Sequence, residues 1–250
     1  LGDITTDSQG NVFLAGSFRG TSTFGKLVIR VTGQRDGFLS KLDSNGRFLW
    51  TKHLDGSFGA DAMSVAVDQS GDIVLMGVFS QRLKLGPFAL GADKSEHRTF
   101  VTKINANGTF LWAEQIIAKS QRGVDLAINS KNEIWVAFSG LLLVKLNTKG
   151  GVLWRWSKPG TLRDTTLTAI ALRQNGNIAF IGAAEKGESF GRLFTARNKG
   201  GFAAEIDGQG ALRWAIGFGG INWRLNTDSR GNLLVTGSKM NKAFMAKYNR

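Results

Sequence analysis

One motif recurs five times along this chain, and it constrains the fold more than any other feature. Each copy has a polar residue, a turn, and then about six mostly apolar residues. The copies begin at Asp7, Asp68, Asn129, Arg173 and Asp228. A repeat of about 40–60 residues built from strands is typical of a β-propeller or a β-solenoid.

A second motif keeps phase with the first. It is a strand that carries a charged residue, then an aliphatic residue or Tyr, then Asp or Asn, and it occupies 38–43, 100–105, 142–147, 202–207 and 244–249. Four of the five copies are followed by a glycine turn and a tryptophan, namely Trp50, Trp112, Trp154 and Trp214. Turns with Gly and Asn or Asp favour tight hairpins, because these residues accept positive φ.

Each repeat is therefore predicted to hold four short strands. The sequence predicts an all-β chain, a β-propeller of about five four-stranded antiparallel blades. We expect one domain over residues 1–250, with repeats at roughly 1–57, 58–120, 121–160, 161–219 and 220–250. The last blade lacks its outer strand within this chain, and we expect residues before Leu1 or a partner to supply it. A first residue that is Leu is typical of a mature product or an excised fragment.

The repeats also differ in length. Repeats one, two and four carry long segments between their second and third strands, which contain Phe24-Gly25, Leu85-Gly86 and Phe190-Gly191. Insertions in repeat proteins usually map to loops on one face, often the binding face.

Taken together, these motifs resemble the bacterial seven-bladed β-propeller repeats, or SBBP-type repeats. The resemblance rests on the Asp-x-x-Gly-Asn turn, the Gly-x-Phe end of strand two, the Phe-Gly insert, the 36–43 run and the Gly-x-x-Leu-Trp strand. That last strand is also similar to quinoprotein-type propeller repeats. The resemblance implies a secreted or surface-exposed bacterial protein with no catalytic set to carry over. The family name suggests seven blades, whereas this chain has room for five.

The composition excludes some kinds of site and favours one class of partner. The chain has no cysteine, which excludes disulfides and thiolate metal sites. It has no apolar stretch long enough to span a membrane as a helix, and no signal peptide is visible. Its formal net charge of +13 favours acidic partners, such as an acidic polysaccharide, lipopolysaccharide or an acidic protein.

The basic residues are scattered, so their interpretation stays open. They are densest in 154–163, 192–199 and 239–250. They either lie solvated on outer strands and loops or form a polyanion-binding face. Nucleic acid is the least supported partner, because no recognition motif accompanies the charge.

The aromatic residues divide into two groups. Those at repeat positions are predicted to fill the space between neighbouring blades, with a sugar-stacking platform as the alternative. They are Trp50, Trp112, Trp154, Trp214, Phe38, Phe100, Phe202 and Phe244. The tryptophans outside the pattern and some arginines are candidate ligand contacts instead. These candidates are Trp135, Trp156, Trp223, Arg155, Arg163, Arg192 and Arg224.

The charged residues at repeat positions are predicted to have structural roles. Lys41, Lys103, Lys145 and Lys247 occupy one position, where the fourth repeat has Glu205. We expect each to pair with the Asp of a turn, either at the rim or between blades. The alternative is a ring of cations along a central channel. The repeat Asp residues are expected to accept backbone N–H bonds.

No motif supports catalysis or metal binding. His53 and His97 have no partner at metal-ligand spacing, and His97 is expected to be solvated in a polar loop. No calcium loop, nucleophile elbow or phosphate-cradling loop is present.

The sequence thus predicts a binding or scaffold module without enzymatic activity, cofactor or metal. It would be extracellular, at the cell surface or periplasmic, and its partner would be a protein or an acidic glycan. The first alternative is a structural subunit of a larger assembly that is completed by strand addition. The second is an enzyme with a site on the propeller axis.

Overall fold

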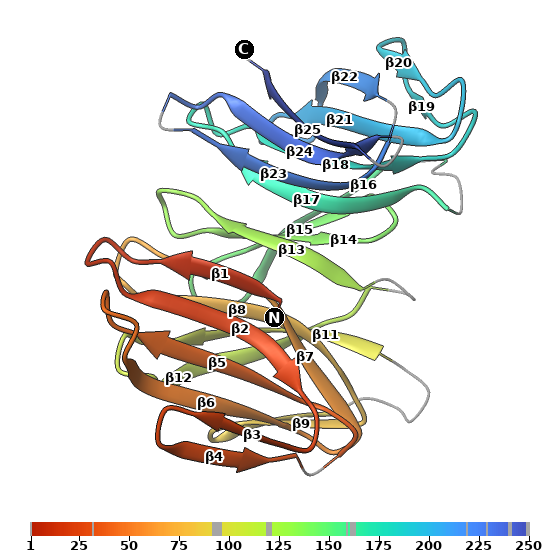
Figure 1. Ribbon diagram of the computed structural model, residues 1–250. Helices are drawn as coiled ribbons and strands as arrows, with labels where there is room; N and C mark the ends of the chain where they lie inside the picture. The colour runs from red at the N-terminus through yellow and green to blue at the C-terminus, as the bar shows by residue number, and fades with distance from the viewer. Residues whose placement is uncertain are drawn as a thin grey trace. The chain divides into compact units, whose positions relative to one another are not determined.

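The structure is a computed structural model of the chain. It describes residues 2–31, 33–91, 97–118, 122–158, 160, 164–218, 220–228, 230–239 and 242–248, with the backbone alone at 221–223. Within these residues all regular structure is β-strand (Figure 1). We call each sheet that corresponds to one sequence repeat a blade.

Each of the first two blades contains four antiparallel strands. Blade 1 has the order β1-β2-β5-β6, and blade 2 consists of β7, β8, β11 and β12 in sequence order across the sheet. Their strands are β1 (Asp3–Thr6), β2 (Val12–Phe18), β5 (Asp36–Leu42), β6 (Phe48–Gly56), β7 (Gly59–Val67), β8 (Ile73–Ser80), β11 (His97–Ile104) and β12 (Phe110–Ile116).

Blades 3 and 4 repeat this order, and blade 5 has three strands among the described residues. Blade 3 contains β13 (Gly123–Ile128), β14 (Ile134–Phe138), β15 (Leu142–Leu146) and β16 (Val152–Ser157). Blade 4 contains β17 (Thr166–Leu172), β18 (Ile178–Ala184), β21 (Gly200–Ile206) and β22 (Leu212–Phe218). Blade 5 contains β23 (Ile221–Thr227), β24 (Leu233–Lys239) and β25 (Lys242–Tyr248).

The three long inserts form small hairpins between the second and third strands of blades 1, 2 and 4. They are β3 (Thr21–Phe24) with β4 (Leu27–Arg30), β9 (Arg82–Leu85) with β10 (Phe88–Gly91), and β19 (Ser189–Phe190) with β20 (Phe194–Thr195). In blades 1 and 4 a hairpin phenylalanine packs on the phenylalanine of strand three. Phe24 lies 4.7 Å from Phe38 and Phe190 lies 4.7 Å from Phe202, between ring centroids. These two inserts are therefore anchored by aromatic contacts. In the insert of blade 2, β9 instead pairs antiparallel with β6 of blade 1 and extends that sheet to six strands.

By its contacts the chain divides into two compact units. Unit 1 comprises residues 1–134 with 146–151, and unit 2 comprises 135–145 with 152–250. The division falls within the third repeat. The single domain over 1–250 therefore stays a prediction.

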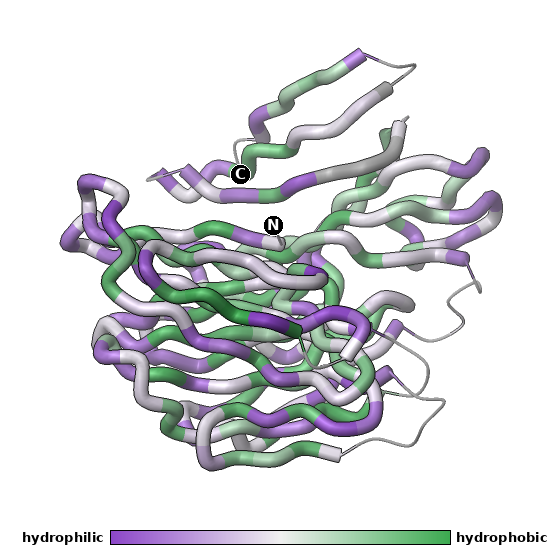
Figure 2. The backbone as a smooth tube through the Cα atoms, turned by 60° about the horizontal axis from the view of Figure 1, so that its bottom comes forward, coloured by the Kyte–Doolittle hydropathy of each residue, from purple (hydrophilic) through white to green (hydrophobic). Residues whose placement is uncertain are grey.

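Each unit has its own buried core. In unit 1, Phe13, Leu39, Leu75 and Phe100 are completely buried and pack in one cluster. In unit 2, Ile181 and Ala203 pack with half-buried aromatic residues, including Phe244 and Tyr248. Hydrophobic residues run along the strands while hydrophilic residues gather at the connections, as Figure 2 shows.

A glycine near the end of strand two faces a bulge in strand one. Pairing of β7 with β8 shifts register between Ala62 and Ser64, opposite Gly77. A Cβ on Gly77 would lie 2.0 Å from the Asp61 carbonyl oxygen. Blade 4 repeats this arrangement, since a Cβ on Gly182 would lie 1.9 Å from the Thr166 carbonyl oxygen. Only glycine fits where the bulged backbone approaches so closely.

Candidate functional site

The first repeated motif is a turn closed by its own side chain. Asp68 Oδ1 accepts hydrogen bonds from the backbone N–H groups of Ser70 (2.8 Å) and Asp72 (3.0 Å). The turn needs a positive φ at its fourth residue, where Gly71 has φ 79°. In the third copy Asn132 takes this position with φ 58°. Asn adopts a positive φ more readily than most other non-glycine residues. The motif therefore builds the turn, as predicted.

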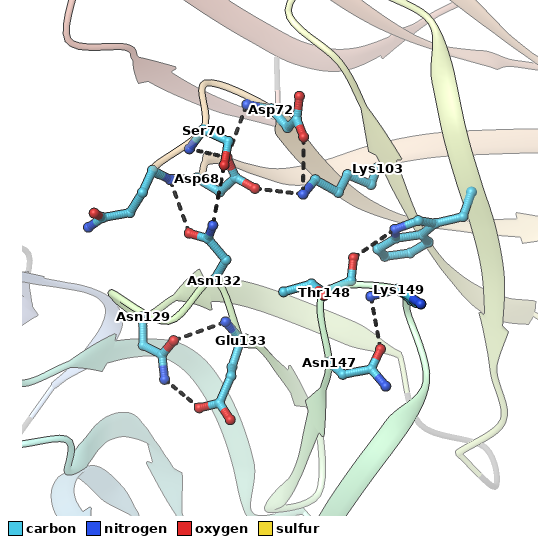
Figure 3. Close-up of polar contacts among 12 residues, drawn as sticks. Asp68, Ser70, Asp72, Lys103, Asn129, Asn132, Glu133, Asn147, Thr148 and Lys149 are labelled. Carbon is cyan, nitrogen blue, oxygen red and sulfur yellow. Dashed lines mark hydrogen bonds and ion pairs between the residues drawn. The ribbon is translucent and has the colours of Figure 1, made fainter.

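The repeated lysine pairs with the acidic residue of its own blade. Lys103 Nζ lies 2.7 Å from Asp68 Oδ2 and 3.1 Å from Asp72 Oδ2 (Figure 3). Burial by itself lowers the pKa of Lys103, but the hydrogen bonds to these two carboxylates outweigh it and raise the pKa. Similar pairs join Lys41 to Asp7 (3.8 Å) and Lys247 to Asp228 (2.8 Å). The predicted pairing with the turn is confirmed for these three, within a blade rather than between blades, so they do not support the cation ring.

The repeated tryptophans of unit 1 join neighbouring blades. Trp50 Nε1 donates to the Ala106 carbonyl (3.2 Å), and Trp112 Nε1 donates to the Thr148 carbonyl (3.1 Å, Figure 3). Both rings lie against the turn glycine of the next blade, Gly108 or Gly150. A second link between blades 2 and 3 comes from Asn132, whose side chain accepts a hydrogen bond from the Gln69 backbone N–H (3.1 Å).

Tryptophans of unit 2 take comparable positions. Trp154 and Trp156 both lie against Gly210 of the next blade, and the Trp156 ring is 5.7 Å from that of Phe180. Trp214 is half-buried and lines an apolar pocket of about 140 Å³ with Ile216 and Leu233.

The structure corrects the prediction for Trp135. Its side chain is 3% exposed, so it offers almost no surface to a ligand. Trp135 occupies the place that Phe13 has in blade 1: Lys145 Nζ lies 5.4 Å from its ring centroid, as Lys41 Nζ lies 5.3 Å from that of Phe13. Its ring also meets Trp154 edge-on, with centroids 5.4 Å apart. Trp135 is thus a core residue at a repeat position.

The other predicted binding residues are spread over the fold. Arg155 on β16, Arg192 in the β19–β20 turn and Arg224 on β23 are exposed and belong to three different blades. Trp156 is half-buried at a blade junction. Arg163 and the side chain of Trp223 lie outside the described residues.

The most distinctive polar site lies in unit 1, where a small pocket gathers three arginines. We call it the arginine pocket. Its volume is about 110 Å³, and its lining consists of Arg19, Gln34, Arg35, Phe58, Gly59, Asp61, Val78, Phe79, Ser80, His97 and Arg122. It lies on the side of the inserts, where Ser80 ends β8 and His97 begins β11.

Loop geometry explains why residues so far apart in sequence meet here. Arg19 and Arg35 flank the insert of blade 1, and Arg122 directly precedes β13. The Gln34 backbone N–H donates to the Phe58 carbonyl (3.1 Å), and the Ala60 N–H donates to the Arg35 carbonyl (2.9 Å). These bonds fix the end of the insert against the connection between β6 and β7.

Two side-chain pairs organise the pocket. Arg35 forms an ion pair with Asp61. Ser80 Oγ and His97 Nδ1 are 2.8 Å apart and share a hydrogen bond. Burial lowers the pKa of His97, and the guanidinium groups of Arg122 and Arg35 lower it further, against the opposite effect of Asp61. His97 is therefore neutral at neutral pH, while the arginines remain charged.

The sequence predicted His97 as solvated and did not single out the arginines of this pocket. His97 is exposed, but it also takes part in the site. The available signal was the position of Arg19 and Arg35 at the two ends of an insert, since inserts were expected on a binding face. No cluster of three or more metal-ligating side chains occurs among the residues that the structure describes.

Comparison with known proteins identifies the fold. No family model matches the chain. The chain is 23% identical, over an alignment of 180 residues, to an uncharacterized WD repeat-containing protein of Acanthamoeba polyphaga mimivirus. That alignment covers 59% of this chain and only 13% of the viral protein.

Two solved structures agree with this repeat similarity. One is a protein of unknown function from Dyadobacter fermentans, with a TM-score of 0.61 and 10% identity over 98% of this chain and 77% of that one. The other is the Dos1 propeller, with a TM-score of 0.50 and 9% identity over 84% of this chain and 51% of that one. The chain is a β-propeller repeat protein. The predicted fold class is confirmed, and at these identities the likeness shows the fold alone. In the described part of the propeller, no helix has the length and hydrophobicity needed to cross a membrane.

Proposed function

We propose that this propeller is a non-enzymatic binding or scaffold module, and that it holds an acidic partner through the arginine pocket. The observation that carries the proposal is the convergence of Arg19, Arg35 and Arg122 on one small pocket. The net charge of +13 supports it, because a strongly positive protein attracts acidic partners and accelerates their association.

The chemistry of the pocket favours binding over catalysis. Guanidinium groups stay protonated, so they bind anions but do not transfer protons. The Ser80–His97 pair has the composition of a nucleophile and a base. In a catalytic triad a third group would orient that base, but the carboxylate among the described residues of the lining, on Asp61, pairs with Arg35 instead.

The partner that we propose is a protein or an acidic glycan, such as lipopolysaccharide or another acidic polysaccharide. We place the encounter outside the cell, at the cell surface or in the periplasm of a bacterium. This part rests on the resemblance of the copies to SBBP-type repeats. Similar loops at regular spacing let weak sites add through effective concentration.

A glycan array with acidic and neutral members, titrated with salt, tests the proposal. We expect binding of acidic members that weakens as salt rises, since exposed charges are screened beyond about 8 Å at physiological ionic strength. The double variant Arg19→Gln/Arg122→Gln should lose most of this binding. Arg47→Gln/Lys149→Gln is the matched control, because it removes the same charge from exposed turns of unit 1. Absent or salt-insensitive binding contradicts the proposal.

A second candidate function is assembly by strand addition. β25 forms one edge of the blade 5 sheet, and no strand among the described residues pairs with its outer side. Its Met245 is 73% exposed. Edge strands of this kind accept a strand from another segment. The mass of the chain in solution tests this candidate, and a monomer that persists at high concentration counts against self-assembly.

A further inference from the structure

A larger pocket lies in unit 2, beside the insert of blade 4. We call the space lined by residues 193–201 and 217–218 the insert pocket. Its volume of about 510 Å³ is within the range of about 300–1,000 Å³ that is usual for small-ligand pockets. The lining comes from the β19–β20 hairpin, the start of β21 and the end of β22, and β20 lies beside β22 (Figure 1). The pocket therefore contains most of the basic segment 192–199 that the sequence singled out.

One part of the lining is apolar and fixed in position. Phe194 stacks on the buried Phe190, with ring centroids 6.1 Å apart and 29° between the ring planes. A Cβ on Gly217 would lie 2.3 Å from the Phe194 ring, so the ring rests directly on the backbone of β22. Phe194 is half-buried and lines the pocket. Its ring is therefore an apolar surface that is placed before a ligand arrives.

The lining also offers a cation that is not engaged. The side chain of Arg197 is exposed and forms no ion pair or hydrogen bond in the described part of the chain. Lys199, in contrast, pairs with Glu185 at 2.5 Å. The backbone next to Arg197 is held, because the Ala196 N–H donates to the Glu188 carbonyl (2.8 Å). A guanidinium presents a planar fork that binds both oxygens of a carboxylate, so Arg197 suits a carboxylate ligand.

Neutral hydrogen-bonding groups accompany the guanidinium. Thr195 and Asn198 line the pocket, and both are exposed. A hydroxyl and an amide each donate and accept, as the hydroxyls of a sugar require. The C–H groups on one face of a sugar ring pack in turn on an aromatic face such as that of Phe194. A hydrophobic acid would use the ring and the guanidinium but not these neutral groups, so the lining favours a sugar that carries a carboxylate.

We infer that the insert pocket binds a uronic acid unit of an acidic polysaccharide, with the carboxylate on Arg197 and the sugar ring against Phe194. Thr195 and Asn198 bind the hydroxyls of the unit. Leu193, at the rim, is 50% exposed, so the pocket is open enough for the polysaccharide to continue beyond the bound unit. This inference rests on the proposed function, since it names a sugar class within the acidic glycan and gives it a site of its own.

NMR titration of the ¹⁵N-labelled whole chain with three probes tests the inference, at neutral pH and constant ionic strength. Methyl glucuronide carries a carboxylate and hydroxyls, methyl glucoside lacks the carboxylate, and cyclohexanecarboxylate lacks the hydroxyls. We expect methyl glucuronide to bind about tenfold more tightly than either of the others. Its largest shifts should fall on the amide signals of residues 193–201 and 217–218.

Two variants and a matched control assign the contacts. Arg197→Gln should weaken methyl glucuronide to the level of methyl glucoside. Arg192→Gln is the control, because it removes the same charge from the exposed turn of the same hairpin but does not line the pocket. Phe194→Leu keeps an apolar side chain against Phe190 and should weaken both sugars alike. Circular dichroism of each variant verifies folding.

The outcomes separate this inference from the proposed function. Equal binding of the two sugars overturns the role of Arg197, and equal binding of methyl glucuronide and cyclohexanecarboxylate overturns the choice of a sugar. Shifts confined to other residues, or no shifts, overturn the inference as a whole. The glycan array tests the proposed function through Arg19 and Arg122, which do not line the insert pocket. An array that responds to that double variant while methyl glucuronide shifts no signal of the insert pocket therefore overturns this inference alone.

Discussion

Arg173 and Glu205 form a buried ion pair whose charges are reversed relative to blades 1, 2 and 5. Arg173 Nε lies 3.6 Å from Glu205 Oε2, and each side chain is 6% exposed. In blade 2 the same two positions hold Asp68 and Lys103, 2.7 Å apart. In blades 1, 2, 4 and 5 this pair of positions therefore carries opposite charges in either order, whereas blade 3 has the neutral Asn129 with Lys145.

The variant Glu205→Lys should destabilise the protein by about 3 kcal/mol or more, because it leaves two buried cations together. Adding Arg173→Asp should recover a large part of the loss, since it restores the arrangement of blade 2. Asn177, whose side chain now donates to Glu205 Oε1 (2.6 Å), would then have an Asp in its own turn to bind. Urea unfolding of the two single variants and the double variant measures the coupling.

A matched control uses the exposed pair Lys199 and Glu185, in which Lys199 is 65% exposed. Lys199→Gln should leave the urea midpoint unchanged within error. A double variant that is no more stable than Glu205→Lys alone would show that side-chain shape, and not charge, decides this position.

The hydrogen bond of Trp112 predicts that replacing this residue by another aromatic residue lowers the stability of the protein modestly. Trp112→Phe keeps a ring against Gly150 but removes the bond to the Thr148 carbonyl, so we expect a loss of about 1 kcal/mol. The neighbouring Leu111 is 44% exposed, and Leu111→Ala should change the free energy of unfolding by no more than about 0.5 kcal/mol. Thermal or urea unfolding compares the two. An equal loss in both variants would contradict the junction role of Trp112.

Gly77 lies opposite the bulge, and its position predicts that adding one methyl group there strongly destabilises the protein. Gly77→Ala would place a Cβ 2.0 Å from the Asp61 carbonyl oxygen and 2.6 Å from the Phe100 ring. The backbone must shift, and we expect a loss of at least about 2 kcal/mol. Gly91→Ala is the control, because its Cβ would meet no atom of the described residues within 4 Å. If Gly77→Ala unfolds at the same urea concentration as Gly91→Ala, the close approach at the bulge is not real.

His97 predicts a pH dependence of stability. Its pKa is lowered in the folded state, so below the ordinary value of 6.5 the unfolded chain binds a proton that the folded chain does not. The contribution of His97 to stability is therefore complete above pH 6.5 and is lost as pH falls through the lower folded pKa. His97→Gln should flatten the stability profile in that acidic window relative to the wild type. An unchanged slope would show that burial and the guanidinium groups of Arg122 and Arg35 do not lower the pKa of His97.

The repeats made the fold predictable because each copy has the same turn residues followed by the same pattern of strands. Turn residues such as Asp68 and Gly71 act on neighbours within a few positions, so their role can be inferred without a structure. The lysine–aspartate pairing was also within reach, because both partners recur in phase. The equivalence of Trp135 to Phe13 was within reach too, since each follows the first residue of its copy at the same spacing, but only the structure showed that Trp135 is buried.

By itself, the sequence determined the number of repeats, the order of strands within a blade and the location of the three inserts. Periodicity and turn chemistry are local properties, and these features depend on little else. Only the tertiary structure decided which scattered bases meet. Arg19, Arg35 and Arg122 are far apart along the chain, and they share a pocket because backbone hydrogen bonds fix the insert of blade 1 against the connection to blade 2. The electrostatic potential at a point depends on which charges are near it in space, so the proposed binding site could not be predicted from composition alone.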